Sequence, residues 1–430
     1  MVLRNLRRRP LATGLTSVSV ALGVALFAAV GALRHAAEHG FQRSAGICDQ
    51  VVGAKGSPLQ LVLSSIYYLG ASPGNVSWDL WRELRTWKGV RWAVPVAIGD
   101  THRGYRVVGV SDEFFSRVRL PNGGEGDPLR LAEGRVFDYP PERFEALAAE
   151  LDAGGDAHLE DHPEVLRAVV GAEAAAGAGL RVGARFAPAH GLEGGAAAER
   201  HAEAEVEVVG VLEPTGTPID RAVFVPVGLY HLLAGHRPTA ETATGGARDP
   251  RGLSAIYLRT VPGMYQIRIW RRLNDRLDAQ SARPVDEVRK LFRLVGGLDL
   301  ALRAISALVV VVAVAGVVAT LTNTMAARRR EFAVLRALGA RRRTLLGLVT
   351  AESAAIAFLG GVLGLVLAGV LAAVASEYVR RNTGVALSVL PRPADLALVG
   401  AVTLAGALAG LLPAVRAYRT EPARVLASQL

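Results

Sequence analysis

Four long apolar runs without a single charged side chain dominate this sequence of 430 residues. These runs are Leu11–Leu33, Ala304–Ala327, Ser353–Ser376 and Leu396–Val415. A helix rises about 1.5 Å per residue, so each run is long enough to cross a hydrocarbon core of about 30 Å. Inside lipid a single segment can satisfy its own backbone hydrogen bonds only as a helix. The sequence therefore predicts a membrane protein with an α-helical bundle of four spans.

Arginines beside these runs predict the orientation of the chain in the membrane. They account for much of the net charge of +10 and lie at residues 4–9, 328–330, 341–343 and 416–424. Short basic loops stay on the cytoplasmic side. Residues 1–33 are therefore predicted to form a cytoplasmic N-terminus and the first span, with the C-terminus also cytoplasmic. A cleaved signal peptide ending near Val30-Gly31-Ala32 is the alternative, but the run is longer than a usual signal.

Residues 34–297 are predicted to form a large extracytoplasmic domain between spans 1 and 2. Short β-branched runs at 106–110, 206–211, 222–226 and 255–258 are typical of strands. The patterns Trp78–Trp87, Pro141–Leu151 and Pro163–Val170 favour helices, so a mixed α+β domain is expected. Helical legs are expected after Arg34 and over Pro284–Arg303. Residues 138–204 are rich in Ala, Gly and acidic residues and are expected to form a mobile insertion.

A short basic segment, residues 328–343, separates the second and third runs. On a helix its apolar side chains Phe332, Leu335 and Leu338 form one ridge, and Glu331 and Arg336 are available as polar contacts. Such a ridge can insert into a groove of a cytoplasmic partner. A basic amphipathic helix also binds lipid headgroups unaided, which is the competing interpretation.

The same segment resembles the permease domain of the FtsX/MacB/LolC-E family of ABC transporters. The segments that resemble the permease domain are Arg328–Ala340, Glu352 with Leu359–Gly364, and the tail Pro413–Leu426. Two further segments, Val206–Pro226 and Leu131–Phe137, resemble parts of the MacB-type periplasmic core domain of this family. It implies an FtsX-like permease domain over residues 298–430, with residues 328–343 as the coupling helix. It also implies a multi-pass protein of the bacterial inner (plasma) membrane.

The resemblance further implies a set of partners. A separate cytoplasmic ABC ATPase would bind ATP and Mg²⁺ and grip the coupling helix, with no cofactor in this chain. A homodimer or a heterodimer with a paralogue is expected, in contact with membrane lipids. ATP hydrolysis would then drive mechanical movement of the outer domain, for export or extraction of a lipid, lipoprotein, peptide or drug-like substrate. Two alternatives are a transducer that controls an extracytoplasmic partner such as a cell-wall hydrolase, and a membrane-anchored sensor without ATPase.

Several residues in or beside the spans are candidates for a structural or functional role. Glu352 lies near the inner end of the third run, where a carboxylate is costly, so either a structural ion pair or a coupling role is expected. The small-residue pairs Gly360/Gly364 and Gly406/Gly410 predict close helix packing, within the bundle or across a dimer.

Other chemistry is poorly supported by the sequence. His190 and His201 lie near acidic residues and are weak candidates for a metal site, but their spacing matches no tight site, and solvated surface histidines are expected. We find no nucleophile elbow, HExxH helix or P-loop, so the chain is not expected to be an enzyme. The single cysteine, Cys48, is expected to be a buried free thiol. Arginines at membrane edges do not indicate nucleic-acid binding.

Overall fold

The computed structural model describes residues 10–121, 126–153, 157–190, 201, 204–233, 252–327, 341–388, 390 and 392–418. The chain divides into two compact units. The first comprises residues 1–37, 294–378 and 387–430, and the second comprises residues 38–293 together with 379–386.

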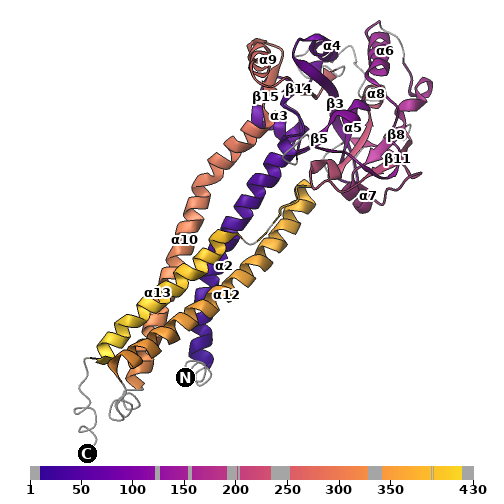
Figure 1. Cartoon of the computed structure of the whole chain (residues 1–430). Helices are drawn as coiled ribbons and strands as arrows, with labels where there is room; N and C mark the ends of the chain where they lie inside the picture. Colours follow the sequence, from indigo (N-terminus) through magenta and orange to yellow (C-terminus); the bar gives the residue numbers. More distant parts are fainter. Residues whose placement is uncertain are drawn as a thin grey trace, which may run out of the picture. The chain divides into compact units, whose positions relative to one another are not determined.

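The first unit is a helical bundle (Figure 1). It is built from parts of four long helices, α2 (Pro10–Ala45), α10 (Pro284–Ala327), α12 (Arg342–Thr383) and α13 (Pro393–Tyr418). Each helix contains one segment that is long and apolar enough to cross a membrane, namely Thr13–Ala45, Leu300–Thr320, Leu346–Thr383 and Pro393–Leu411. The prediction of a four-span helical membrane protein is thereby confirmed.

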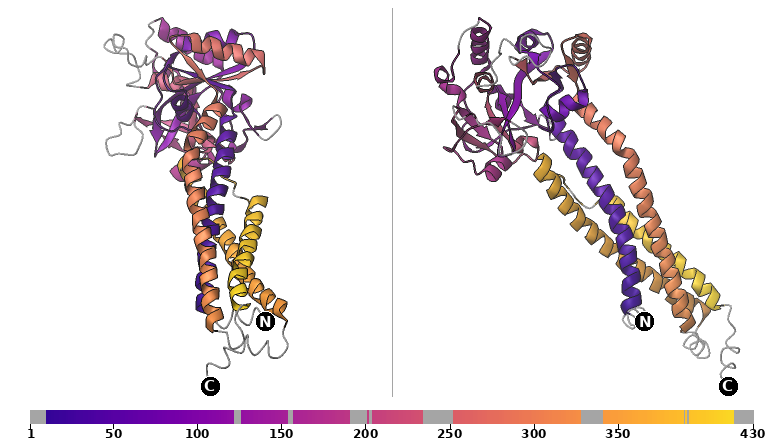
Figure 2. Two further views of the ribbon diagram at one scale, coloured as in Figure 1. Left: turned by 90° about the vertical axis from the view of Figure 1, so that its left-hand side faces the viewer. Right: turned by 180° about the vertical axis from the view of Figure 1, so that it is seen from behind.

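Small and β-branched side chains fill the centre of this bundle, whose helices lie side by side in both views of Figure 2. Val24 of α2, Val317 of α10, Ile356 of α12 and Val402 of α13 are buried against one another. Large apolar side chains point outward instead, as at Leu308, which is 63% exposed. Apolar side chains on the outside suit a surface that faces lipid.

The paired glycines lie where helices of the bundle meet. A Cβ atom at Gly364 would stand 2.7 Å from the carbonyl oxygen of Ala21, so α12 approaches α2 there at backbone distance. Gly360 faces residues of α2 in the same way, and Gly406 and Gly410 face α12. Both pairs therefore lie at contacts within this chain.

The second unit is built on a mixed sheet, which has eleven strands among the described residues (Figure 1). Its order is β15 (Gln280–Ala282), β1 (Gln50–Gly53), β14 (Ala255–Thr260), β3 (Val90–His102), β4 (Tyr105–Val110), β12 (Ala222–Pro226), β8 (Arg167–Val170), β11 (Val206–Leu212) and β7 (Leu131–Gly134). Two short strands, β10 (Ala189–His190) and β9 (Arg185–Phe186), pair with β3 and β11. Two small ribbons pair β13 (Gly252–Leu253) with β2 (Val76–Ser77) and β5 (Arg119–Leu120) with β6 (Asp127–Pro128).

Short helices accompany the sheet. They are α3 (Pro58–Ser65), α4 (Trp78–Thr86), α5 (Glu113–Arg117), α6 (Pro141–Asp152), α7 (Ala172–Ala178), α8 (Val227–Leu232) and α9 (Met264–Asp275), with 3₁₀ turns η1 (Leu159–Asp161), η2 (Pro163–Val165) and η3 (Pro218–Arg221). The predicted mixed α+β domain is confirmed. The core is aromatic where α5 meets the sheet, since the rings of Phe114 and Phe224 stack with centroids 4.8 Å apart.

Two sequence-based predictions in this domain are wrong. The helix expected over Pro163–Val170 is a 3₁₀ turn followed by β8, because the apolar end of that segment pairs with β11 and β12 inside the sheet. The described parts of the segment 138–204, expected to be a mobile insertion, contribute α6, β8 and α7 to the folded domain, whereas residues 154–156, 191–200 and 202–203 lie outside the described residues. Its small residues permit close packing: Ala174 is fully buried, and Gly171 abuts the backbone of η3.

We predict that Gly364→Ala destabilises the bundle. The added methyl group meets the backbone of α2, and overpacking of this kind costs about 1–3 kcal/mol. The matched control is Gly369→Ala in the same helix, where a Cβ meets nothing within 4 Å and the helix gains up to about 1 kcal/mol of propensity. Far-UV circular dichroism during unfolding of the detergent-solubilised protein measures both. Equal stability of the two variants contradicts the close contact.

Candidate functional site

The predicted coupling residues lie outside the described part of the chain. Glu331, Phe332, Leu335, Arg336 and Leu338 all fall within residues 328–340, so their docking role stays a prediction. Glu352 is described and is buried at 9% exposure on α12. Glu352 has an interaction partner, so both predicted roles, the structural ion pair and the coupling role, stay open.

The two helical legs meet the outer domain through aromatic side chains. Phe41, near the end of α2, packs edge-on against Phe292 of α10 with ring centroids 5.9 Å apart. Phe41 also stacks on Tyr67 at 5.0 Å, and the Tyr67 hydroxyl donates a hydrogen bond of 2.5 Å to the Phe41 carbonyl oxygen. Within the second unit, the ends of both legs therefore belong to one packed cluster.

The same two legs lead directly into neighbouring strands. Strand β1 begins five residues beyond the end of α2, and β15 ends just before α10 begins. These strands pair antiparallel, with Val51 opposite Ala282 and Val52 opposite Ser281. Backbone hydrogen bonds of a ladder resist shear collectively, so the two legs share a stiff junction in the sheet.

One carboxylate fastens this junction to the next strand. Asp49 lies between α2 and β1 and accepts hydrogen bonds from β14, at 2.7 Å from the Arg259 guanidinium and 2.8 Å from the Thr260 backbone N–H. Arg259 also donates to the backbone carbonyl of Ile47 at 2.8 Å. Asp49 and Arg259 are separated by 210 residues, so no sequence pattern could have paired them.

A third helix also reaches the outer domain. The last residues of α12 and those that follow, 379–386, belong to the second unit. Arg380 forms an ion pair with Glu173 of α7, and the Ala386 N–H donates a hydrogen bond of 2.9 Å to the Gly216 carbonyl oxygen. Gly384 has a positive φ of 72° and lies against Pro218 of η3, where a side chain would not fit. Arginines followed by glycine are typical of a helix end, but they do not reveal where that end docks.

The loop that receives this segment is organised by Asp220. Its buried carboxylate accepts hydrogen bonds from the backbone N–H groups of Thr215 and Gly216, both at 2.8 Å, and from the Thr215 hydroxyl. Burial raises the pKa of the Asp220 carboxyl, and the hydrogen bonds from Thr215 oppose that rise. The sequence analysis missed this residue because its partners lie in an irregular loop without a periodic pattern.

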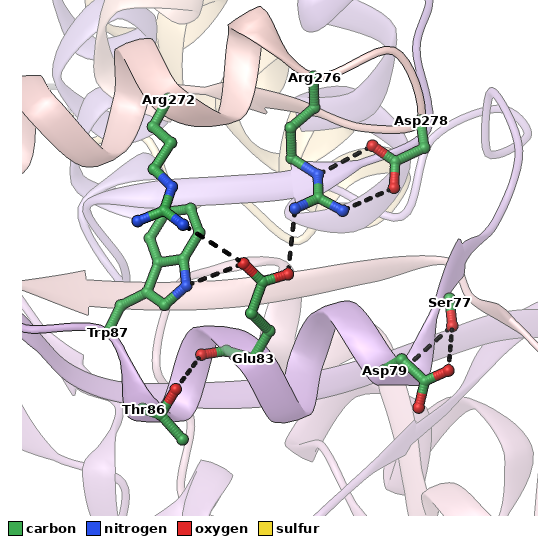
Figure 3. Close-up of polar contacts among 8 residues, drawn as sticks. All are labelled: Ser77, Asp79, Glu83, Thr86, Trp87, Arg272, Arg276 and Asp278. Carbon is green, nitrogen blue, oxygen red and sulfur yellow. Dashed lines mark hydrogen bonds and ion pairs between the residues drawn. The ribbon is translucent and has the colours of Figure 1, made fainter.

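Helices α4 and α9 are braced by the polar cluster drawn in Figure 3. Glu83 of α4 accepts a hydrogen bond from the Trp87 indole at 3.1 Å and forms ion pairs with Arg272 and Arg276 at 3.7 and 3.0 Å. The Arg272 guanidinium stands 4.0 Å from the centre of the Trp87 ring. Hydrogen bonds from Arg276 hold the pKa of the Asp278 carboxyl below its usual range. Each of the residues drawn in Figure 3 contacts at least one other residue of the cluster, which suits a structural role.

Of the two histidine candidates, only His201 has a side chain among the described residues, so the pair stays untested as a metal site. No group of three or more His, Cys, Asp or Glu side chains in that part of the chain could hold a metal ion. His201 is buried at 4% exposure beside Asp100, so it is not the solvated surface histidine that was expected. His190 pairs with Asp100 through the β10–β3 backbone ladder. Cys48 is buried, and burial raises the pKa of its thiol far above the usual range, which suits a structural residue.

Comparison with known families defines the class of protein. The model of the MacB-like periplasmic core domain matches residues 13–264, more than half of the chain, and that of the FtsX-like permease C-terminal domain matches residues 303–422. An outer domain between spans 1 and 2 followed by three further spans fits this order. The chain therefore belongs to the FtsX/MacB-type family of ABC transporter permeases, and it is a multi-pass membrane protein.

Individual relatives are more distant. The chain is 35% identical over 129 residues to the macrolide export ATP-binding/permease protein MacB of Nitrobacter winogradskyi, covering 30% of this chain and 19% of that protein. It is 31% identical over 137 residues to the pyoverdine export ATP-binding/permease protein PvdT of Pseudomonas entomophila, covering 32% of this chain and 20% of that protein. The matched stretches thus span about a fifth of each relative.

Solved structures of outer domains are also similar to part of this chain. The extracellular domain of the noncanonic ABC-type transporter YknZ from Gram-positive bacteria is 14% identical, with a TM-score of 0.28, covering 54% of this chain and 97% of that one. The periplasmic region of MacB from Actinobacillus actinomycetemcomitans is 12% identical, with a TM-score of 0.30, covering 57% of this chain and 92% of that one.

We predict that Asp49→Ala destabilises the outer domain by about 2 kcal/mol. The substitution removes the acceptor of the Thr260 N–H and of one N–H group of Arg259, and hydrogen bonds to charged groups contribute roughly this much. Thermal unfolding of the full chain in detergent, followed by tryptophan fluorescence, measures the effect. The control is Asp275→Ala at an exposed position of α9, which should leave the midpoint unchanged. An unchanged midpoint for Asp49→Ala refutes the role of this carboxylate.

A charge exchange tests the docking of the α12 end. Arg380→Glu places two carboxylates together beside α7, so the 379–386 segment should detach and the Ala386 amide should exchange with deuterium faster. The double variant Arg380→Glu/Glu173→Arg restores opposite charges and should restore protection. Hydrogen exchange with mass spectrometry on the full chain reports both. Fast exchange in the wild-type protein would show that the segment does not dock.

Proposed function

We propose that this chain is the permease subunit of an ABC complex that moves its outer domain mechanically when a cytoplasmic ATPase hydrolyses ATP. One observation carries the proposal: α2 and α10 each continue without a break from an apolar span into the outer unit and lead into adjacent strands. A helix is stiff along its axis, so a displacement at one end reaches the other. Paired strands at that end convert the relative movement of two helices into strain on one sheet.

The coupling helix is the proposed input of this device. Residues 328–341 join α10 to α12, so a force applied to the predicted coupling helix acts on a leg and on the helix whose end docks at η3. Phe332, Leu335 and Leu338 supply the apolar ridge that enters a groove of the ATPase, with Glu331 and Arg336 at its edge. The ATPase, carried by a separate chain in this proposal, binds ATP and Mg²⁺.

The relatives named above guide the proposed task. Their printed names concern export of macrolides and of pyoverdine, which favours a small drug-like or peptide molecule over a lipid or lipoprotein. Two copies of this chain, or one copy with a paralogue, flank the pathway in the proposal. The same mechanical device also serves a transducer that moves no substrate and acts on an extracytoplasmic partner. Transport assays in reconstituted vesicles separate the two, since only an exporter changes the substrate concentration.

We predict that Leu335→Asp abolishes stimulation of the cognate ATPase by this chain while membrane insertion is retained. A carboxylate in the middle of the apolar ridge must be desolvated to dock, at a penalty of several kcal/mol. ATPase rates of the co-purified complex in nanodiscs, with and without the variant, measure the loss.

The matched control is Arg343→Gln, which alters a side chain off the ridge and should keep at least half of the stimulation. Full stimulation by Leu335→Asp contradicts the docking mechanism. A photocrosslinker at residue 335 that captures lipid alone, and no ATPase, favours instead a membrane-anchored sensor.

A further inference from the structure

A cleft on the outer domain gathers four arginines from four different elements. Arg91 comes from β3, Arg117 from α5, Arg119 from β5 and Arg259 from β14, and they surround a space of about 500 Å³ together with Trp92 and Ser116. We call this the arginine cleft. None of its described lining residues carries a carboxylate.

Like charges repel, so a cluster of this kind needs counter-charges. Two of the arginines form ion pairs with carboxylates that do not line the cleft. Arg259 pairs with Asp49 at 2.7 Å, and Arg117 approaches Glu113 at 3.8 Å. Arg119 donates only to the neighbouring Val118 carbonyl oxygen at 3.1 Å, and the exposed Arg91 has no ion pair with a described residue. Among the described residues, two of the four arginines, Arg91 and Arg119, therefore have no carboxylate partner.

The walls of the cleft are held in place independently of any ligand. Arg259 stands opposite Trp92 in the β14–β3 ladder, and its guanidinium lies 5.6 Å from the centre of the Trp92 ring. Arg119 opposes Pro128 in the β5–β6 ribbon. The Arg259 guanidinium and the backbone at Arg119 are thus fixed before a ligand binds, and a donor that is already held in place loses little entropy on binding.

We infer that the arginine cleft binds a phosphate group carried by a larger molecule. The planar guanidinium fork matches two oxygens of a phosphate, and a charge near −1 to −2 complements the two uncompensated arginines. A space of about 500 Å³ exceeds what inorganic phosphate alone needs, and the Trp92 face offers an apolar surface to the carrier. The phosphate belongs either to a phospholipid headgroup or to a soluble phosphate ester. This assignment does not depend on the proposed transport mechanism.

Calorimetry on the full chain in dodecyl maltoside, a detergent without phosphate, tests the site. The probes are inorganic phosphate, glycerol 3-phosphate and dihexanoyl phosphatidylglycerol, each titrated at a constant moderate salt concentration. We expect saturable binding of at least one organic phosphate. Tighter binding of dihexanoyl phosphatidylglycerol assigns a lipid headgroup, and tighter binding of glycerol 3-phosphate assigns a soluble ester. The absence of saturable binding for both organic probes, or equal affinity for inorganic phosphate, overturns the proposal.

Variants separate this site from general positive charge. Arg91→Gln/Arg119→Gln should weaken binding at least about tenfold, since each substitution removes a charge-assisted hydrogen bond to the phosphate. Arg268→Gln/Arg271→Gln removes the same charge from exposed positions on α9 and should change affinity less than about twofold. Arg91→Lys/Arg119→Lys keeps the positive charge but removes the guanidinium fork, so its affinity should lie between those of the cleft glutamine variant and the α9 glutamine variant. Retained binding by this lysine variant shows that the cleft can be substituted without unfolding the domain. Equal weakening by the cleft and α9 glutamine variants refutes a specific site.

Discussion

The pairing of β1 with β15 is the contact on which the arrangement of this protein depends. Each of these short strands is the immediate neighbour in sequence of a long helix, α2 for β1 and α10 for β15. Their ladder is reinforced by the hydrogen bonds that β14 donates to Asp49 and by the packing of Phe41 on Phe292, and it holds the ends of the two helices at one edge of the sheet. Without that ladder, the outer domain would be tethered by two independent helices and could not register their relative movement.

The end of α12 adds a connection that differs in kind from the two legs. The legs are covalent continuations of the sheet, whereas residues 379–386 are held by an ion pair, one backbone hydrogen bond and close packing at Gly384. Contacts of this type open at lower energy than a strand ladder. In the mechanism we propose, the third attachment is therefore the one suited to making and breaking, while the β1–β15 junction stays intact.

The general architecture was predictable because it follows from local composition. Uncharged apolar runs of membrane length have one stable outcome, and the strands around Val107, Val208 and Val223 were evident from β-branched residues. Prediction failed where small or ambiguous residues acquire their structure from neighbours. Ala168–Val170 become a strand because β11 and β12 flank them. The described part of the Ala/Gly-rich segment packs closely because η3 lies against Gly171 and β4 lies against Gly177. His201 was expected at the surface because its burial beside Asp100 depends on a contact across 101 residues of sequence.

The sequence alone determined that this chain crosses a membrane four times, carries an α+β domain between spans 1 and 2, and belongs with the FtsX/MacB-type permeases. Those properties reside in segments whose own composition decides their environment. Only the tertiary structure decided that the two legs meet on adjacent strands, that α12 docks against η3, and that four arginines distant in sequence line one cleft. Each of these depends on side chains and backbone groups from far-apart segments, and no local pattern encodes which of them will meet.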